Sequence, residues 1–423
     1  MSKTTYEEDD DVEYPPGNLM TPPRTPERDN RRQAILNIRQ QWRLDHNSRS
    51  PKKKRRSNEE QARAFFRASP EPKELDTIRD RVRKFVEAQG TSRIVVVTSG
   101  STPVPLEKKT VRYIDNFSTG TRGARCVENF LRNGYAVIFL HRSGSAFPFL
   151  TNISSQLRQK PSELYNETVS SPSKALQDRL ETVQFDSLFS YLFLLREICQ
   201  IVSKVDKRCM IVLAAAVADF YVPTSSMAKE KIQSRSHDGL ELKLKNTPKM
   251  LGLIRSTWGA SNAMIVSFKL ETNENILLAK AAGAIQKYNV DAVVANVLET
   301  RYDEVHVIRK LDDESVVEIK GTISGEETEA ISVSGVAKDT VRKDSFDVIE
   351  LPLVRKLCDL HAEKMGLSLE EIQNMNKNNK KKLFSDWSPA DTDRAVFRTA
   401  AIASTIGAIA MIFLWGSSRR ARR

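Results

Sequence analysis

Glycine, hydroxyl and carboxamide side chains gather in short segments whose chemistry suits phosphate binding. Ser118, Gly120 and Gly123 stand as S-x-G-x-x-G directly before an apolar helical pattern. Glycine lets a backbone approach phosphate oxygens, and the free N–H groups and dipole of a helix N-terminus attract anions. The motif alone is equally typical of a tight turn followed by a close helix contact. It therefore predicts either an anion-binding loop or a structural turn.

Three further polar segments each follow an apolar run. They are T-S-G-S-T at residues 98–102, A-A-A-V-A-D-F-Y-V-P at 214–223, and the pair 267–272 and 295–299. Taken singly, Asp219 could cap a helix and Asn296 could close a strand. Their shared position after predicted strands favours a single site instead.

The apolar runs that precede these segments predict the elements that position them. They lie at residues 93–100, 135–140, 210–217, 263–268 and 291–297, with apolar residues at helical spacing between them. Continuous rather than alternating hydrophobicity is typical of a parallel sheet covered on both faces. We therefore predict a three-layer, Rossmann-like α/β domain over residues 72–370, with its site where the strands' carboxyl ends meet.

Two features are expected to be added to this domain. Residues 304–308 and 315–319 are short apolar runs separated by acidic turn residues, which predicts an appended antiparallel β-hairpin. Residues 150–182 are polar and lack a clear period, which predicts a long surface insertion.

Familiar nucleotide fingerprints are missing from the sequence. There is no G-x-G-x-x-G after the first strand, no G-x-x-x-x-G-K and no Y-x-x-x-K pair. An ordinary nicotinamide-dependent oxidoreductase or P-loop ATPase is therefore disfavoured.

The net charge of +12 is concentrated at the two ends of the 423-residue chain. Residues 71–374 contain 41 Lys and Arg against 40 Asp and Glu, so the predicted domain is nearly neutral. Nucleic-acid binding needs basic charge on the folded body, and no nucleic-acid partner is predicted. Residues 1–70 are charged and poor in apolar residues, which predicts a disordered arm. Its P-K-K-K-R-R run at residues 51–56 is either a nuclear import signal or a solvated basic run.

The C-terminal end carries a different signal. A charged linker at residues 375–398 precedes 18 uncharged residues at 399–416, which are followed by R-R-A-R-R. Length and flanking charge favour a transmembrane tail anchor, and the alternative is a buried or interfacial helix rich in small residues.

The four cysteines are scattered, with no C-x-x-C pair and no histidine at metal-ligand spacing. This pattern predicts reduced, buried thiols in a cytoplasmic protein and leaves the metal ligands unassigned.

Seven motifs together resemble the phosphopantothenate–cysteine ligase family in its eukaryotic form, the phosphopantothenoylcysteine synthetases of coenzyme A biosynthesis. They follow in the family's order over residues 72–370, and both tails lie outside the resemblance. The motifs are V-T-S-G-S-T-P-V-P-L-E, V-R-Y-I-D-N-F-S-T-G-T-R-G-A, F-L-H-R-S-G-S-A-F-P, L-A-A-A-V-A-D-F-Y-V-P, K-E-K-I-Q-S, I-V-S-F-K-L-E-T and V-V-A-N-V-L-E-T-R.

The resemblance implies a Rossmann-like homodimer that joins L-cysteine to 4'-phosphopantothenate. The substrate carboxylate attacks the α-phosphate of ATP to give an acyl-adenylate and pyrophosphate, and the cysteine amine then displaces AMP. Mg²⁺ is implied as the companion of the triphosphate. The residues do not reveal whether ATP or CTP is preferred.

The resemblance also implies residue roles. Nucleotide contacts fall on Gly100, Ser118, Gly120, Gly123, Phe268 and Asn296. Contacts to phosphopantothenate and the acyl-nucleotide fall on Asn116, Ala215, Ala216 and Asp219. Arg112 matches an arginine that reaches the substrate phosphate in the other subunit. Lys231 matches a mobile-loop lysine that closes over the intermediate and stabilises charge on the α-phosphate, although without the resemblance it is typical of a solvated loop lysine.

One position departs from the family's usual T-S-G-G-T, because Ser101 replaces the second glycine. If that position requires positive φ, serine costs on the order of 1 kcal/mol. Two functions remain as alternatives: an oxidoreductase on a similar sheet, and a membrane-tethered scaffold without catalysis.

Overall fold

The computed structural model describes residues 57–150, 178–233, 240–311, 316–320, 330–334, 336–343, 348–368 and 370–371. These residues belong to a unit that begins at Ser57. The basic run at 51–56, the linker at 375–398 and the apolar segment at 399–416 lie outside the described residues.

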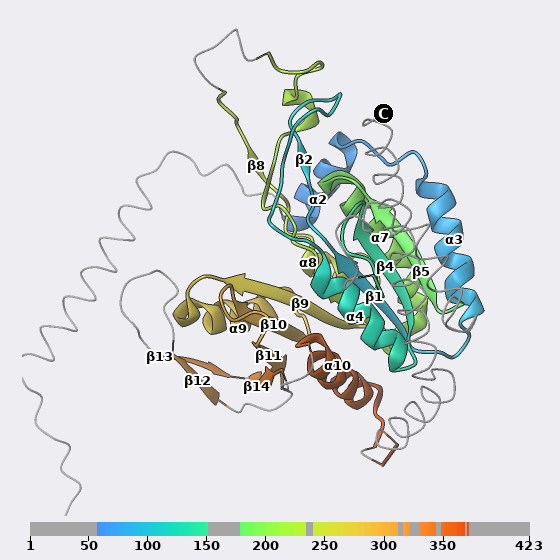
Figure 1. Ribbon diagram of the computed structural model, residues 1–423, viewed down its shortest axis with the longest axis vertical. Helices are drawn as coiled ribbons and strands as arrows, with labels where there is room; N and C mark the ends of the chain where they lie inside the picture. The colour runs from blue at the N-terminus through green and yellow to red at the C-terminus, as the bar shows by residue number, and fades with distance from the viewer. Residues whose placement is uncertain are drawn as a thin grey trace, which may run out of the picture. The chain divides into compact units, whose positions relative to one another are not determined.

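An eight-stranded sheet forms the centre of this unit (Figure 1). Its spatial order is β14-β11-β10-β9-β6-β1-β4-β5, and the six strands from β5 to β10 run parallel. The parallel strands are β1 (Ile94–Ser99), β4 (Ala136–Arg142), β5 (Leu180–Phe185), β6 (Cys209–Leu213), β9 (Met264–Glu271) and β10 (Ala292–Val297). In chain order their arrangement is 3-2-1-4-5-6, the doubly wound Rossmann order, which confirms the predicted mainly parallel α/β fold.

Helices cover both faces of the sheet and make the two hydrophobic cores. One core joins α4 (Thr121–Arg132) and α10 (Glu350–Met365) to one face. The other core lies under α3 (Leu75–Ala88), α7 (Leu188–Val202) and α9 (Glu274–Tyr288). All six residues of β1 are buried, as a strand covered on both faces requires.

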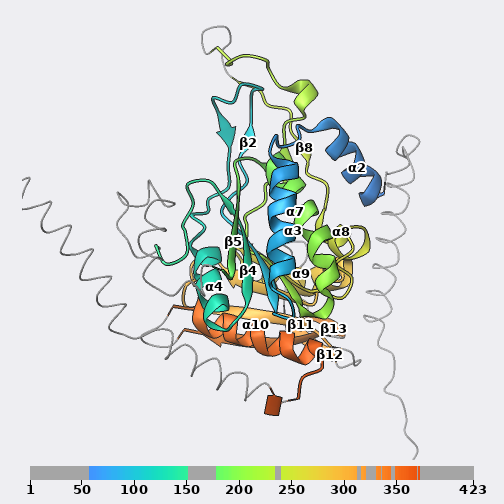
Figure 2. The ribbon, with the colours of Figure 1, turned by 90° about the vertical axis from the view of Figure 1, so that its right-hand side faces the viewer.

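Shorter elements complete the described part of the chain. They are α2 (Asn58–Ala68), α8 (Leu251–Ser256), the 3₁₀ turns at Ser203–Arg208 and Thr224–Ser226, and the two-residue strands β2 (Val104–Pro105), β3 (Tyr113–Ile114), β7 (Phe220–Tyr221) and β8 (Lys245–Asn246). β2 and β8 lie side by side and project from the same end of the sheet (Figures 1 and 2).

The predicted hairpin at residues 304–308 and 315–319 is wrong. β11 (Glu304–Lys310) pairs instead with β14 (Val336–Arg342) and with β10, antiparallel to both, and extends the main sheet. β12 (Val316–Lys320) pairs with β13 (Ala330–Ser334) in a separate two-stranded sheet. The local turn signal indicated the correct strands but the wrong partners, because β10 and β14 occupy both edges of β11.

The ordered unit begins earlier than residue 72. Helix α2 lies within the segment predicted to be disordered, and Ser57 closes a capping box with Glu60 at its start. Phe65 is 2% exposed and stacks on Phe189, while Phe66 meets Phe193 edge to face. These aromatic contacts offset the ordering entropy that the composition of the arm alone does not.

The transmembrane prediction is corrected. Across the parts of the chain that the structure describes, no helix combines the length and apolar character needed to cross a membrane. The anchor is therefore not retained. Of the predicted insertion at 150–182, residues 151–177 lie outside the described residues, while residues 180–182 belong to β5.

Acid is expected to destabilise the domain through His361 on α10. This histidine is fully buried, and its Nε2 donates to the Lys207 carbonyl at 2.9 Å while its Nδ1 accepts from the Tyr135 hydroxyl at 2.9 Å. Burial lowers the pKa of His361 from 6.5 to about 4. The folded state therefore binds fewer protons than the unfolded state, so this stability is complete above pH 6.5 and is lost as the pH falls towards 4.

The expected loss in the free energy of unfolding between pH 7 and pH 5 is about 2 kcal/mol. Urea unfolding at pH 7 and pH 5 measures it, with His361→Gln as the variant that removes the titrating group. The variant should show a smaller drop between the two pH values than the wild type. Equal drops would contradict the assignment to His361.

Candidate functional site

The crevice between β1 and β6 is where the strand order reverses. In open α/β sheets this topological switch point is the usual ligand site, at the carboxyl ends of the strands. The loops that follow the two strands are bonded together: Ala216 N donates to the Gly100 carbonyl at 2.8 Å, and Thr102 N donates to the Ala216 carbonyl at 3.3 Å. The structure thus brings the predicted residues Gly100, Ala215 and Ala216 together at one edge of the sheet.

The S-x-G-x-x-G motif lies at the start of α4, beside the end of β1. Gly120 has φ 79° and is the residue from which the helix begins. The Ser99 hydroxyl donates to its carbonyl at 2.8 Å. A Cβ added at Gly123 would lie 2.3 Å from Ser99 Oγ. Both glycines are therefore required by contacts within the protein, in addition to any approach to phosphate.

Gly100 and Ser101 explain the departure from the family motif. Gly100 has φ 88°, and a Cβ there would lie 2.7 Å from the Cβ of Arg142. Ser101 is not among the residues with positive φ, and its hydroxyl accepts from Arg142 Nη1 at 2.6 Å. Serine at this position is therefore unstrained and anchors the neighbouring loop.

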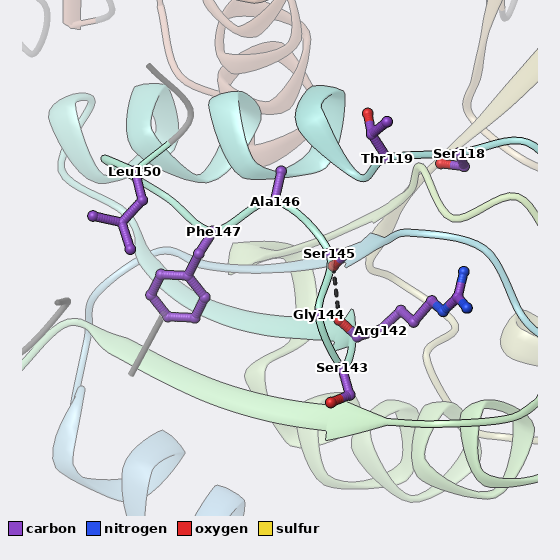
Figure 3. Close-up of a pocket in the computed structure, with 9 residues that line it drawn as sticks. All are labelled: Ser118, Thr119, Arg142, Ser143, Gly144, Ser145, Ala146, Phe147 and Leu150. Carbon is purple, nitrogen blue, oxygen red and sulfur yellow. Dashed lines mark hydrogen bonds between the residues drawn. The ribbon is translucent and has the colours of Figure 1, made fainter. Parts of the chain in front are cut away.

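A cavity of about 320 Å³ opens beside this edge (Figure 3). Its lining is Ser118, Thr119, Arg142, Ser143, Gly144, Ser145, Ala146, Phe147 and Leu150. Arg142 forms an ion pair with Asp115, and its carbonyl accepts from the Ser145 hydroxyl at 2.7 Å. No role for this loop was predicted from the sequence, although its residues appear in the motif F-L-H-R-S-G-S-A-F-P. The structure places it as a wall of the same site, next to Ser118.

His141 precedes this loop and is 2% exposed. Its ring stacks on Phe139, and burial lowers its pKa to about 4. A neutral, packed imidazole does not act as a proton donor at neutral pH. This agrees with a structural role for the one histidine near the site.

Asn116 links the α4 loop to the β6 loop. Its Nδ2 donates to the Ala216 carbonyl at 3.3 Å, although the residue remains exposed. Asp219 lies further along the β6 loop, with 68% of its side chain exposed, and its carboxylate pairs with Lys249 Nζ at 2.7 Å. Lys249 is a neighbour that the sequence reasoning missed, because 30 residues separate the pair.

Phe268 and Asn296 lie on adjacent strands, β9 and β10, farther along the same edge. Asn296 is 6% exposed. Arg122, which the motif left without a role, stands 6.0 Å from the Phe268 ring centroid and 3.7 Å from the buried carboxylate of Glu350. It therefore connects the start of α4 to β9 and α10.

Arg112 directly precedes β3, and Lys231 lies between the 3₁₀ turn at Thr224–Ser226 and β8. Lys231 is exposed, and 38% of the Arg112 side chain is exposed. Arg112 Nη1 donates to Glu107 at 2.8 Å and to the Ile232 carbonyl at 3.1 Å. The two segments are thus joined to each other.

Known proteins resemble this chain in sequence. Residues 182–342 match the model of the DNA/pantothenate metabolism flavoprotein C-terminal domain. Phosphopantothenate–cysteine ligase 1 of Arabidopsis thaliana is 44% identical over 266 residues, covering 57% of this chain and 83% of the relative. The human phosphopantothenate–cysteine ligase is 40% identical, covering 53% of this chain and 78% of the relative.

Solved structures give the same result. A Cab2 mutant in complex with phosphopantothenate-cysteine superposes with a TM-score of 0.56 at 33% identity, covering 72% of this chain and 98% of that chain. Fold and sequence therefore agree, and the chain belongs to the phosphopantothenate–cysteine ligase family.

Proposed function

We propose that this protein ligates L-cysteine to 4'-phosphopantothenate and forms 4'-phosphopantothenoylcysteine for coenzyme A biosynthesis. The observation that carries the proposal is the likeness to the Cab2 mutant bound to phosphopantothenate-cysteine, of which this chain covers 98%. In the first step the substrate carboxylate attacks the α-phosphate of ATP, and pyrophosphate leaves. In the second step the cysteine amine attacks the acyl carbon, loses a proton and displaces AMP.

Positioning and electrostatics would supply most of the catalysis. Ser118, Gly120 and Gly123 would present the start of α4 to the triphosphate, where backbone N–H groups favour anions. Phe268 and Asn296 would contact the nucleotide from β9 and β10. The Asn116 amide has two N–H donors, and one of them bonds to the Ala216 carbonyl at 3.3 Å. The other would donate to the acyl-phosphate without adding charge. Holding both substrates in reacting geometry removes an entropic barrier, so no covalent enzyme intermediate is needed.

Mg²⁺ would accompany ATP and neutralise charge on the departing pyrophosphate. Within the described ranges, no group of three or more acidic, histidine or cysteine side chains could hold a metal ion. Mg²⁺ is usually held by phosphate oxygens, water and one or two carboxylates, so it does not require a full set of protein ligands. The exposed carboxylate of Asp219 would provide such an oxygen.

A homodimer would complete each site, with Arg112 reaching the substrate phosphate in the other subunit. Exposed apolar side chains around Arg112 support this proposal. Val111 is 55% exposed, Tyr113 is 53% exposed and Phe117 is 87% exposed. A second copy of the chain that covers them would remove this apolar surface from water.

The test is product formation by the purified protein. With ATP, Mg²⁺, 4'-phosphopantothenate and cysteine, AMP and pyrophosphate should be released only when phosphopantothenate is present. The same assay with CTP establishes the nucleotide preference. Release of ADP, or no turnover with either nucleotide, would refute the proposal, and a change in NADPH fluorescence on mixing would favour an oxidoreductase.

Lys231→Gln is expected to slow adenylation about tenfold or more, because the variant loses a positive charge from the α-phosphate. Lys231 is exposed, so folding should be unaffected. Single-turnover quenching measures the acyl-adenylate directly, and Lys287→Gln on α9 serves as a lysine control. A wild-type rate of intermediate formation would remove Lys231 from the mechanism.

A further inference from the structure

Glu107 is a buried carboxylate that the mechanism above does not use. It follows β2 and is 0% exposed. Its two oxygens together accept from N–H donors on two separate segments of the chain. Oε2 accepts from Val111 N at 3.3 Å and from Arg112 N at 3.0 Å, and Oε1 accepts from Arg112 Nη1 at 2.8 Å and from Ile232 N at 3.4 Å.

These bonds determine the ionisation of Glu107. Burial raises the pKa of the carboxyl group, but the hydrogen bonds from the Arg112 backbone and guanidinium, from Val111 and from Ile232 outweigh burial and leave the pKa below its ordinary value. The group is therefore an anion at neutral pH. A buried anion with four donors is costly to disturb, because removing its charge leaves those donors without an equivalent partner.

Further contacts join the same two segments. Glu107 and Ala228 form a parallel β-bridge, and Lys108 N donates to the Ala228 carbonyl at 2.9 Å. At the surface, Lys109 Nζ lies 3.0 Å from a carboxylate oxygen of Glu230. The segment that carries Arg112 and the segment that carries Lys231 are thus joined by main-chain, buried and exposed contacts, with Glu107 at the centre.

We propose that Glu107 is a positioning residue that couples Arg112 to Lys231, so that substrate phosphate bound at Arg112 orders the loop that places Lys231 at the reacting phosphate. The proposal rests on the ligase function above. Glu107 acts through Arg112 and through the Ile232 backbone, next to Lys231, and touches no substrate itself. In a dimer in which Arg112 serves the neighbouring site, the same carboxylate would connect the two sites.

Glu107→Gln is the informative variant. Because each carboxylate oxygen accepts from two donors, either orientation of the glutamine amide turns its NH₂ group towards N–H donors. The KM for 4'-phosphopantothenate should rise about tenfold and kcat should fall, since displacements of about 1 Å at a site cost up to a hundredfold. In an Arg112→Ala background the substitution should raise KM no further, because the coupled contact is already lost.

Glu197→Gln is the matched control. Glu197 lies on α7 and is 8% exposed, and its Oε2 is 2.7 Å from Arg79 Nε. Like Glu107, it is therefore a buried carboxylate bonded to arginine. Its substitution should lower the melting temperature and leave both KM and kcat unchanged. A merely structural role for Glu107 would also lower the melting temperature and leave KM unchanged. Vmax would then fall only because fewer molecules are folded.

Trypsin provides a readout that does not depend on turnover. Phosphopantothenate should slow cleavage after Lys231 in the wild type, as followed by mass spectrometry, and should give no protection in Glu107→Gln. If that variant does not fold, Arg112→Ala tests the same coupling, because Arg112 bonds directly to the Ile232 carbonyl. Equal protection in the wild type and the variants, or an unchanged KM, overturns the coupling. An inactive wild type overturns the proposed function instead.

Discussion

Asn116→Asp is expected to reduce adenylation about a hundredfold or more, a loss typical of removing one well-placed donor from a polar transition state. The Asn116 amide donates to the Ala216 carbonyl at 3.3 Å, and an aspartate in its place turns a carboxylate oxygen towards that carbonyl oxygen. It also adds negative charge where the triphosphate and phosphopantothenate both bring negative charge. Pyrophosphate release in the first turnover measures the effect.

The stability of this variant should change little, because Asn116 is exposed. Gln200→Glu, at an exposed position on α7, makes the same amide-to-carboxylate change away from the site and should retain wild-type activity. Thermal unfolding of both variants separates a chemical effect from a folding effect. Wild-type pyrophosphate release by Asn116→Asp would exclude Asn116 from catalysis.

Gly123→Ala is expected to destabilise the domain by about 1–3 kcal/mol, the usual cost of overpacking a core. The added Cβ would lie 2.3 Å from Ser99 Oγ and 3.2 Å from Ser99 Cα, so α4 must move away from β1. That shift also displaces the start of the helix, and we expect activity to fall with stability. Urea unfolding gives the free energy of unfolding.

Gly283→Ala is the matched control, because a Cβ at this exposed position of α9 meets no atom within 4 Å. Better helix propensity should stabilise that variant by up to about 1 kcal/mol. Adding Ser99→Gly to Gly123→Ala removes the side chain that the new Cβ would meet, so the two effects should be clearly non-additive. Strict additivity would show that the contact with Ser99 is not the cause.

The sequence predicted the central strands because they are continuous apolar runs. β1, β4, β6, β9 and β10 all formed near their predicted positions. It failed to predict β5 and α7. α7 (Leu188–Val202) is apolar on nearly every side, so it lacks the amphipathic period from which a helix is normally inferred.

Local sequence patterns did not predict which strands pair with each other. The short acidic turn after residue 310 indicated a hairpin, whereas β11 pairs with β14, whose partner residues lie about 30 positions away, as for Arg309 and Ala337. A period of two identifies a strand but carries no information about its neighbour. Likewise, the average composition of residues 1–70 concealed α2, which is held by contacts with α7.

The sequence by itself determined the family and the mainly parallel α/β sheet, because these depend on residue types at fixed local spacing. Only the tertiary structure showed that Gly123 faces Ser99, that Arg142 anchors Ser101, and that Glu107 is buried beneath Arg112 and Ile232. Glu107 and Arg112 are five positions apart, but the other contacts join residues 24 to 125 positions apart. The energies of all these contacts depend on distance and burial, which a linear pattern does not record.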